Sequence, residues 1–231
     1  KNNRWLEDAL PNYNVKWTKF DSGADINTAF VAKQIDFGAI GSSPVARGLS
    51  APLNIGYQVA FILDVAGDNE ALVARNGTNI NSVADLKGKQ VGIAGGPVDK
   101  SWLILRAWSM RPDSPTGGED IGKATTQVFG APPMIMNALE TGEVAAALNF
   151  WHFQAKMMAG GARQILDVND AAKDLGLDPA TPLLGYVLRE SWIKEHPDAA
   201  RGLAKASAEA KAILAKAHDE GLELPGIDDS K

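Results

Sequence analysis

Short apolar segments alternate with helical segments along almost the whole chain. The apolar segments have the length and composition of buried strands and cover residues 15–20, 35–40, 53–63, 90–94, 124–130, 144–150, 163–168 and 181–190. Segments with helical spacing lie between them, at 26–34, after Pro44, and at 99–108, 133–140, 153–161 and 197–217. This alternation is typical of an α/β fold with mainly parallel sheets. We predict two similar α/β units, the second beginning after the polar stretch 75–81.

The composition excludes several classes of function. Of the 231 residues 45% are hydrophobic, which is enough for a substantial core. The formal net charge of -5 argues against a nucleic-acid surface, because binding to phosphates requires clustered Lys and Arg. The absence of cysteine excludes disulfide bonds, iron–sulfur clusters and cysteine nucleophiles. The three histidines have no spacing that suggests a metal site, so we expect neither a metal nor another cofactor.

The chain contains no apolar run near the ~20 residues that a membrane-spanning helix requires. It opens on Trp5, Leu6 and Leu10, which have helical spacing with no capping residue in front of them. We therefore expect that an N-terminal segment is missing from this sequence.

A Gly-Ser-Ser-Pro turn joins an apolar strand to a helix in residues 37–49, FGAIGSSPVARGL. We predict that Ser43 caps a helix that begins at Pro44, which leaves the N–H groups of Val45 and Ala46 free at the positive end of the helix dipole. These donors, with the hydroxyl groups of Ser42 and Ser43, would suit an anion. A plain helix cap is the alternative explanation of the turn.

Two further junctions of small residues follow apolar strands. Residues 21–24 (DSGA) follow the strand at 15–20, and residues 95–97 (GGP) follow the strand at 90–94, again with Pro at the predicted first helical position. In open parallel sheets such junctions share the carboxyl edge, where ligands bind. The chain has no phosphate-loop motif and no dinucleotide fingerprint, so the pattern favours a small anion over a nucleotide.

Candidate catalytic residues are few. There is no Gly-x-Ser-x-Gly elbow, and the serines of the turn have no base that the sequence reveals, so we predict no catalytic site. Asn149, Trp151 and His152 end an apolar strand and are candidate ligand contacts; alternatively, Trp151 belongs to the core and His152 to the surface. Asp99 is expected to cap its helix, whereas Lys100 opposes the helix dipole and is a candidate partner of an anion.

Residues 17–49, WTKFDSGADINTAFVAKQIDFGAIGSSPVARGL, closely resemble periplasmic taurine and aliphatic-sulfonate binding proteins, in the nitrate/sulfonate/taurine solute-binding family of ABC importers. The resemblance continues through DNEALVAR, INSVADLKGKQVGIAGGP, ALETGEVAAAL and LRESWIKEHPDAAR, and it covers most of the chain. The pairing of KFDSG with GSSP is its most specific part.

The resemblance implies a two-lobe periplasmic-binding-protein fold of type II. Lobe I would comprise residues 1–74 and 184–231, without the family's first strand and last helices, and lobe II residues 75–183, with two crossing strands as the hinge. It also implies a monomer in the periplasm, or lipid-anchored outside the membrane, that binds a small anionic solute and an ABC permease in the inner membrane but no nucleic acid. The expected ligand-binding residues are Ser22, Gly23, Gly41, Ser42, Ser43, Glu70, Gly96, Pro97, Asp99, Lys100, Asn149, Trp151, His152 and Tyr186.

The sequence departs from taurine binders at one informative position. Where they carry an acidic residue that would face the taurine amine, this chain has Leu184 or Gly185, so a different ligand is expected, with any positive group met by Asp99 or Glu70. Two alternatives to a transport protein stay open. One is an enzyme on the same fold, similar to those of the menaquinone pathway, and the other is the effector-binding lobe of a transcription regulator.

Overall fold

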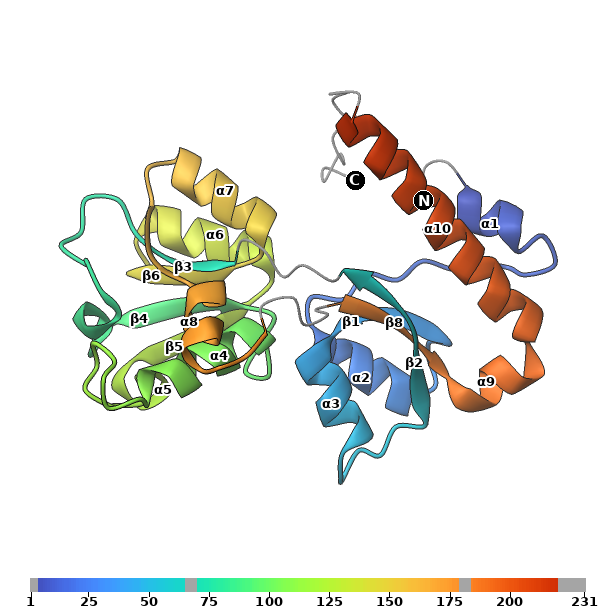
Figure 1. The fold of residues 1–231 in the computed structure, drawn as a ribbon, viewed down its shortest axis with the longest axis horizontal. Coiled ribbons are helices and arrows are strands. Elements are labelled where there is room, and N and C mark those ends of the chain that lie inside the picture. The colour runs from blue at the N-terminus through green and yellow to red at the C-terminus, as the bar shows by residue number, and fades with distance from the viewer. Residues whose placement is uncertain (1–3, 65–69, 179–183, 220–231) are drawn as a thin grey trace. The chain divides into compact units, whose positions relative to one another are not determined.

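The computed structural model describes residues 4–64, 70–178 and 184–219 (Figure 1). By its internal contacts the chain divides into two compact units. Unit 1 contains Lys1–Thr18 and Glu190–Lys231, and unit 2 contains Lys19–Arg189. Among the described helices, none is both long enough and apolar enough to cross a membrane.

Unit 2 contains a three-stranded sheet in the order β1-β8-β2, formed by Phe37–Gly41, Leu184–Arg189 and Tyr57–Asp64. The central strand β8 is antiparallel to both neighbours, which therefore run in the same direction. Helices α2 (Gly23–Val31) and α3 (Ser42–Leu49) pack on this sheet. The core between them is built from Phe30, Ile40, Val45, Ile55, Tyr57 and Val187.

Unit 2 also contains a five-stranded sheet in the order β5-β4-β6-β3-β7. The strands are, in chain order, β3 (Ala71–Ala74), β4 (Gln90–Ala94), β5 (Thr126–Gly130), β6 (Ala146–Asn149) and β7 (Arg163–Asp167). Strands β4, β5 and β6 are parallel, whereas β3 runs antiparallel to its neighbours β6 and β7. Each sheet therefore has one strand, β8 or β3, that opposes the others, and the sequence pattern did not reveal this reversal.

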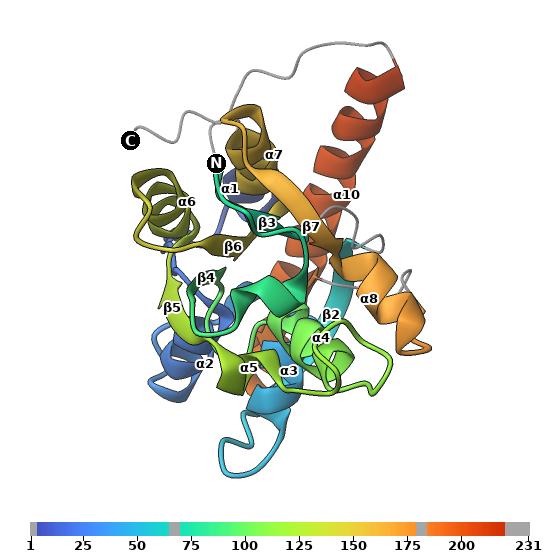
Figure 2. The same ribbon diagram turned by 90° about the vertical axis from the view of Figure 1, so that its left-hand side faces the viewer.

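Helices cover both faces of the five-stranded sheet (Figure 2). One face packs against α4 (Lys100–Ser109), α5 (Ile121–Ala124) and α8 (Val168–Asp174), and the other against α6 (Pro132–Thr141) and α7 (Trp151–Ala159). Because side chains alternate along a strand, Leu72 belongs to the first core and Val73 to the second. Both side chains are fully buried. A short 3-10 helix, η1 (Val83–Leu86), precedes β4.

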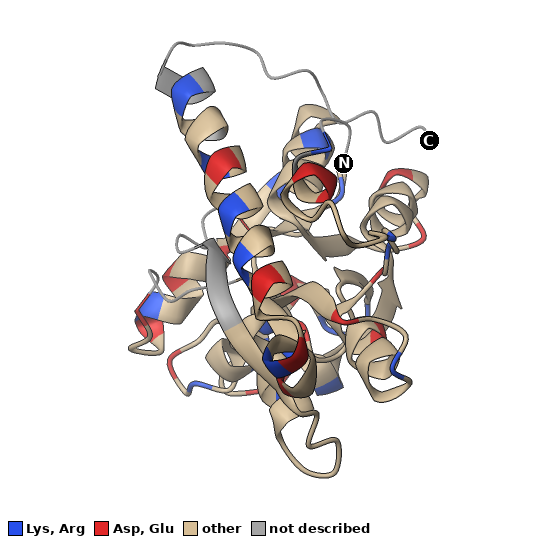
Figure 3. Ribbon diagram, turned by 90° about the vertical axis from the view of Figure 1, so that its right-hand side faces the viewer, with Lys and Arg blue, Asp and Glu red and all other residues tan. Residues whose placement is uncertain are grey.

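Unit 1 is helical and contains α1 (Trp5–Ala9), α9 (Glu190–Glu195) and α10 (Pro197–Asp219). Leu6 and Leu10 are buried where α1 packs on α10, and a Cβ at Gly202 would collide with Leu10. The hydroxyl group of Tyr13 donates a hydrogen bond of 2.9 Å to Asp198, which fixes the first turn of α10. Lys, Arg, Asp and Glu residues are spaced along α10 (Figure 3).

Two predictions of local structure, at residues 15–20 and at Pro97, are wrong. Residues 15–20 form no strand, because no described strand lies beside them to pair with their N–H and C=O groups. Pro97 is not the first residue of a helix: it lies in the loop after β4, and α4 begins only at Lys100.

Candidate functional site

Three junctions at the ends of strands carry most of the predicted ligand contacts. They are the start of α3 after β1, the loop between β4 and α4, and the start of α7 after β6. Because β4 and β6 are parallel neighbours, the last two junctions lie at the same edge of the five-stranded sheet.

The first turn of α3 presents two backbone donors. The helix begins at Ser42, and its N-cap is Gly41, which is extended and makes no side-chain cap. The predicted cap at Ser43 is therefore wrong, since Ser43 is the second helical residue. The free N–H groups of this turn belong to Ser42 and Ser43 rather than to Val45 and Ala46, which lie far enough along the helix to bond within it.

Buried hydrogen bonds hold α3 in place. The side chain of Asn27, 3% exposed, donates 2.8 Å to the carbonyl of Pro44 and accepts 2.9 Å from the hydroxyl of Tyr57. Burial raises the pKa of Tyr57 to about 12, so this hydroxyl stays a donor at neutral pH. These bonds fix the direction of α3 and therefore of its first-turn amides.

The predicted contacts at the start of α2, Ser22 and Gly23, have structural roles. Ser22 is the N-cap of α2, and its oxygen accepts 3.2 Å from the amide of Asp25. Gly23 packs on Pro44, where an added Cβ would lie 2.5 Å from the proline ring. Both residues therefore support the packing of α2 against α3.

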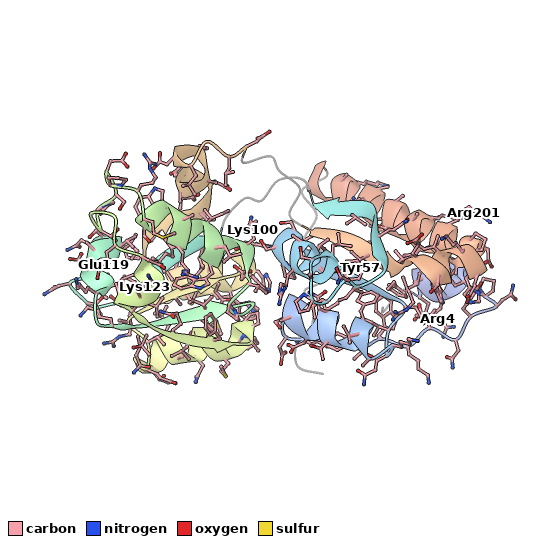
Figure 4. All side chains as sticks on the ribbon, turned by 90° about the horizontal axis from the view of Figure 1, so that it is seen from below. Arg4, Tyr57, Lys100, Glu119, Lys123 and Arg201 are labelled. Carbon is pink, nitrogen blue, oxygen red and sulfur yellow. The ribbon has the colours of Figure 1, made fainter. Side chains whose placement is uncertain are left out.

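The loop between β4 and α4 turns through two glycines with left-handed backbone, Gly95 (φ 80°) and Gly96 (φ 85°). Asp99 then caps α4, as expected, by accepting 2.9 Å from the amide of Ser101 and 3.1 Å from that of Trp102. Lys100, labelled in Figure 4, is the first residue of α4.

A second carboxyl group lies beside this cap. The buried hydroxyl of Ser101 donates a hydrogen bond to Glu70, so Ser101 links Glu70 to Asp99. Burial, and then the nearby charge of Glu70, raise the pKa of Asp99 to about 7. Burial also raises the pKa of Glu70, against the opposing effects of Ser101 and Lys100. Sequence reasoning missed Ser101, whose position two residues after a capping Asp is its only signal.

A cavity of about 340 Å³ in unit 2 brings three of the predicted residues together. Ser42, Ser43 and Lys100 form polar parts of its lining. Asn169 and Asp178 add further polar groups, and the remaining wall is apolar, made by Leu103, Ile104, Ala107, Ala172, Leu175 and Leu177. The sequence analysis did not identify this wall, although residues 103 and 107 have the i, i+4 spacing of one helix face.

The other predicted contacts do not line this cavity. Asn149 is 1% exposed, and its amide is engaged with Pro132 at 2.9 Å and with the backbone of Phe150 at 2.9 Å. Trp151 is 61% exposed, so it is not a core residue, and its ring lies 5.2 Å from that of His152. Tyr186 is half-buried on β8, where burial raises its pKa.

Among the described residues, no group of three or more His, Cys, Asp or Glu side chains could hold a metal ion. The cavity instead combines the start of a helix, two hydroxyl groups and one ammonium group with an apolar wall, and Asn169 and Asp178 add an amide and a carboxyl group. This arrangement suits an anionic head group attached to an apolar body.

Comparison with known proteins places this chain in a family. The NMT1/THI5-like family matches residues 14–220. The taurine-binding periplasmic protein of Escherichia coli K12 is 26% identical over 213 residues, which are 91% of this chain, and the chain spans 61% of that protein's length.

Two solved structures share the fold. The alkanesulfonate-binding protein SsuA of Xanthomonas axonopodis pv. citri, bound to MOPS, has a TM-score of 0.70 at 18% identity, over 96% of this chain and 74% of its own. The aliphatic sulphonate binding protein SsuA of Escherichia coli has a TM-score of 0.64 at 21% identity, with the same coverage of both chains. The chain belongs to the NMT1/THI5-like family and has the α/β fold of these periplasmic binding proteins.

Proposed function

We propose that this chain is the solute-binding component of an ABC importer and that it binds a small organic anion of the sulfonate class. The observation that carries the proposal is the position of Ser42, Ser43 and Lys100 around one cavity. The family and the sulfonate-binding relatives support it.

The anionic head would be held by hydrogen bonds and by charge. Ser42 and Ser43 would donate from backbone and hydroxyl groups at the positive end of α3, and the ammonium group of Lys100 would supply the opposite charge. The apolar wall would contact the body of the ligand and favours a hydrocarbon body over the charged amine of taurine. Leu184 or Gly185, where taurine binders carry an acid, supports the same preference.

No bond of the solute would be made or broken. The described part of the cavity lining contains no histidine, and no described base makes a hydrogen bond with Ser42 or Ser43. Ligand would instead favour a closed state reached by bending near β3 and β8, the strand that opposes the others in each sheet. The protein would act as a monomer in the periplasm and present this closed state to a permease in the inner membrane.

The double substitution Ser42→Ala with Ser43→Ala tests the anion site. Loss of charge-assisted hydrogen bonds should weaken sulfonate binding by about 1–3 kcal/mol, or roughly 5- to 150-fold in Kd. Isothermal titration calorimetry with 1-butanesulfonate and 1-hexanesulfonate measures this effect.

A matched control is Ser50→Ala, which removes an exposed hydroxyl at the other end of the same helix. The control should keep the wild-type affinity. Equal affinity of the double variant and the wild type would remove Ser42 and Ser43 from the binding site.

A further inference from the structure

A second polar cavity lies at the opposite edge of the five-stranded sheet. Strand β3 pairs antiparallel with β6, with Ala71 opposite Asn149 and Ala74 opposite Ala146. The residues that follow Ala74 therefore lie at the far edge from Asn149 and from the start of α7. A cavity of about 370 Å³ opens there, lined by two glycines and by Arg75, Asn76, Thr78, Asn79, Asn81 and Arg163.

The charged groups in the described lining of this cavity are all positive. Two guanidinium groups contribute to it, together with three asparagines and one threonine, and none of its described residues is a carboxylate. Two like charges around one cavity repel each other and attract an anion, which an arginine side chain can hold through paired N–H donors.

Arg163 is fixed in place by its own contacts. Its guanidinium donates 2.8 Å to the side chain of Asn81 and 2.8 Å to the carbonyl of Ile80. These bonds tie β7 to the loop after β3 and hold a positive charge at the cavity without neutralising it, because both acceptors are uncharged.

Arg75 is the contrasting case. Within the described parts of the chain its guanidinium has no hydrogen bond and no ion pair, and its Nε is buried without a partner. The group lies against the backbone of Gly142, where an added Cβ would be 3.2 Å from one terminal nitrogen and 3.3 Å from Cζ. The buried Nε–H costs stability because nothing accepts from it, and the terminal N–H groups of this half-buried guanidinium can donate to an acceptor that enters the cavity.

We propose that this cavity binds a compact oxyanion, a phosphate or sulfate group, between Arg75 and Arg163. The amide side chain of Asn76 would add a donor, and Gly161 leaves the room that this side chain needs, since an added Cβ would lie 2.6 Å from its nitrogen. The site is independent of the proposed sulfonate site, because it is built from different residues at the opposite edge of the sheet.

The test is a titration of the ¹⁵N-labelled chain with inorganic phosphate, followed by NMR. The proposal predicts saturable shifts of the backbone amides of Gly77 and Gly161 and of the Nε–H signal of Arg75. Separate amide signals from Ser42 and Ser43 report on the sulfonate site, so failure at one site is distinguishable from failure at the other.

Two substitutions and one control complete the experiment. Arg75→Gln should weaken phosphate binding at least tenfold, and Asn79→Asp should do the same by placing a carboxylate in the cavity without removing the buried guanidinium. Arg111→Gln should have no effect, because Arg111 pairs with Asp113 and Asp174 outside this cavity. Shifts that do not saturate, or that persist unchanged in both cavity variants, would overturn the proposal.

A second experiment distinguishes a free oxyanion from the phosphate group of a lipid. Vesicles containing phosphatidylglycerol should broaden the same signals if the cavity takes a lipid phosphate. Response to inorganic phosphate alone identifies a free anion as the ligand, and either response supports an oxyanion site.

Discussion

Asp99 combines a structural role with an unusual ionisation. It caps α4 through the amides of Ser101 and Trp102, and Ser101 also donates to Glu70. Burial and the neighbouring carboxyl group raise the pKa of Asp99 to about 7, so the folded state holds a proton there that an unfolded chain releases near pH 4.

Asp99→Asn should change how stability depends on pH. Because the pKa is raised in the folded state, the native protein binds more protons than the unfolded chain between about pH 4 and pH 7, and its free energy of unfolding falls as pH rises through that window. The variant keeps an oxygen acceptor for the cap but cannot ionise. We expect the free energy of unfolding, measured with urea, to fall between pH 5 and pH 8 by roughly 1–4 kcal/mol more in the wild type than in the variant. An identical loss in both proteins would contradict the raised pKa.

The local role of Asp99 was predictable from the sequence, and the roles of residues with long-range partners were not. The cap at Asp99 follows from its position before a helix. The burial of Asn149 and the exposure of Trp151 depend on how α6 and α7 pack against the sheet, which no local pattern encodes. The pairing of Ser101 with Glu70 joins residues 31 positions apart and was missed for the same reason.

At the scale of single elements, α3 is positioned by a close approach to β2. Gly48 of α3 lies over Tyr57, and an added Cβ would collide with the tyrosine hydroxyl and lie 2.8 Å from Oδ1 of Asn27. The absence of a side chain at Gly48 therefore allows the hydrogen bonds that fix the start of the helix.

Gly48→Ala should destabilise the protein despite the higher helix propensity of alanine. Propensity favours the change by up to ~1 kcal/mol, but overpacking against Tyr57 and Asn27 should cost more, for a net loss of about 1–3 kcal/mol. Urea denaturation measures the loss. Gly56→Ala is the matched control, since a Cβ there meets no atom within 4 Å. A Gly48 variant as stable as this control would show that α3 shifts freely.

Most strands and helices were predictable from apolar spacing, and the failures have physical causes. The pattern at residues 15–20 reads as a strand, but a strand needs a partner, and none of the described strands supplies one. The spacing of apolar residues also does not indicate the direction of a strand, so the antiparallel direction of β3 and β8 was known only from their pairing in the structure. The start of α3 differed from the prediction because Gly41 begins the helix without a side-chain cap.

At the scale of the whole molecule, unit 2 carries both candidate sites. The cavity with Ser42, Ser43 and Lys100 includes the start of α4, whereas the cavity with Arg75 and Arg163 lies at the other edge of the five-stranded sheet. The division into lobes at residues 74 and 183 stays a prediction. The chain spans 61% of the length of its taurine-binding relative.

The central claim is that the protein binds an organic anion, and thermal unfolding tests it most directly. A ligand of the native state stabilises it in proportion to the logarithm of concentration over Kd, by about 2.7 kcal/mol at 100 times Kd. We predict that 1-hexanesulfonate raises Tm with this logarithmic dependence and that 1-hexylamine, which has the same body and the opposite charge, does not. If no sulfonate from ethane- to octanesulfonate raises Tm, or if the amine raises it equally, the account is contradicted.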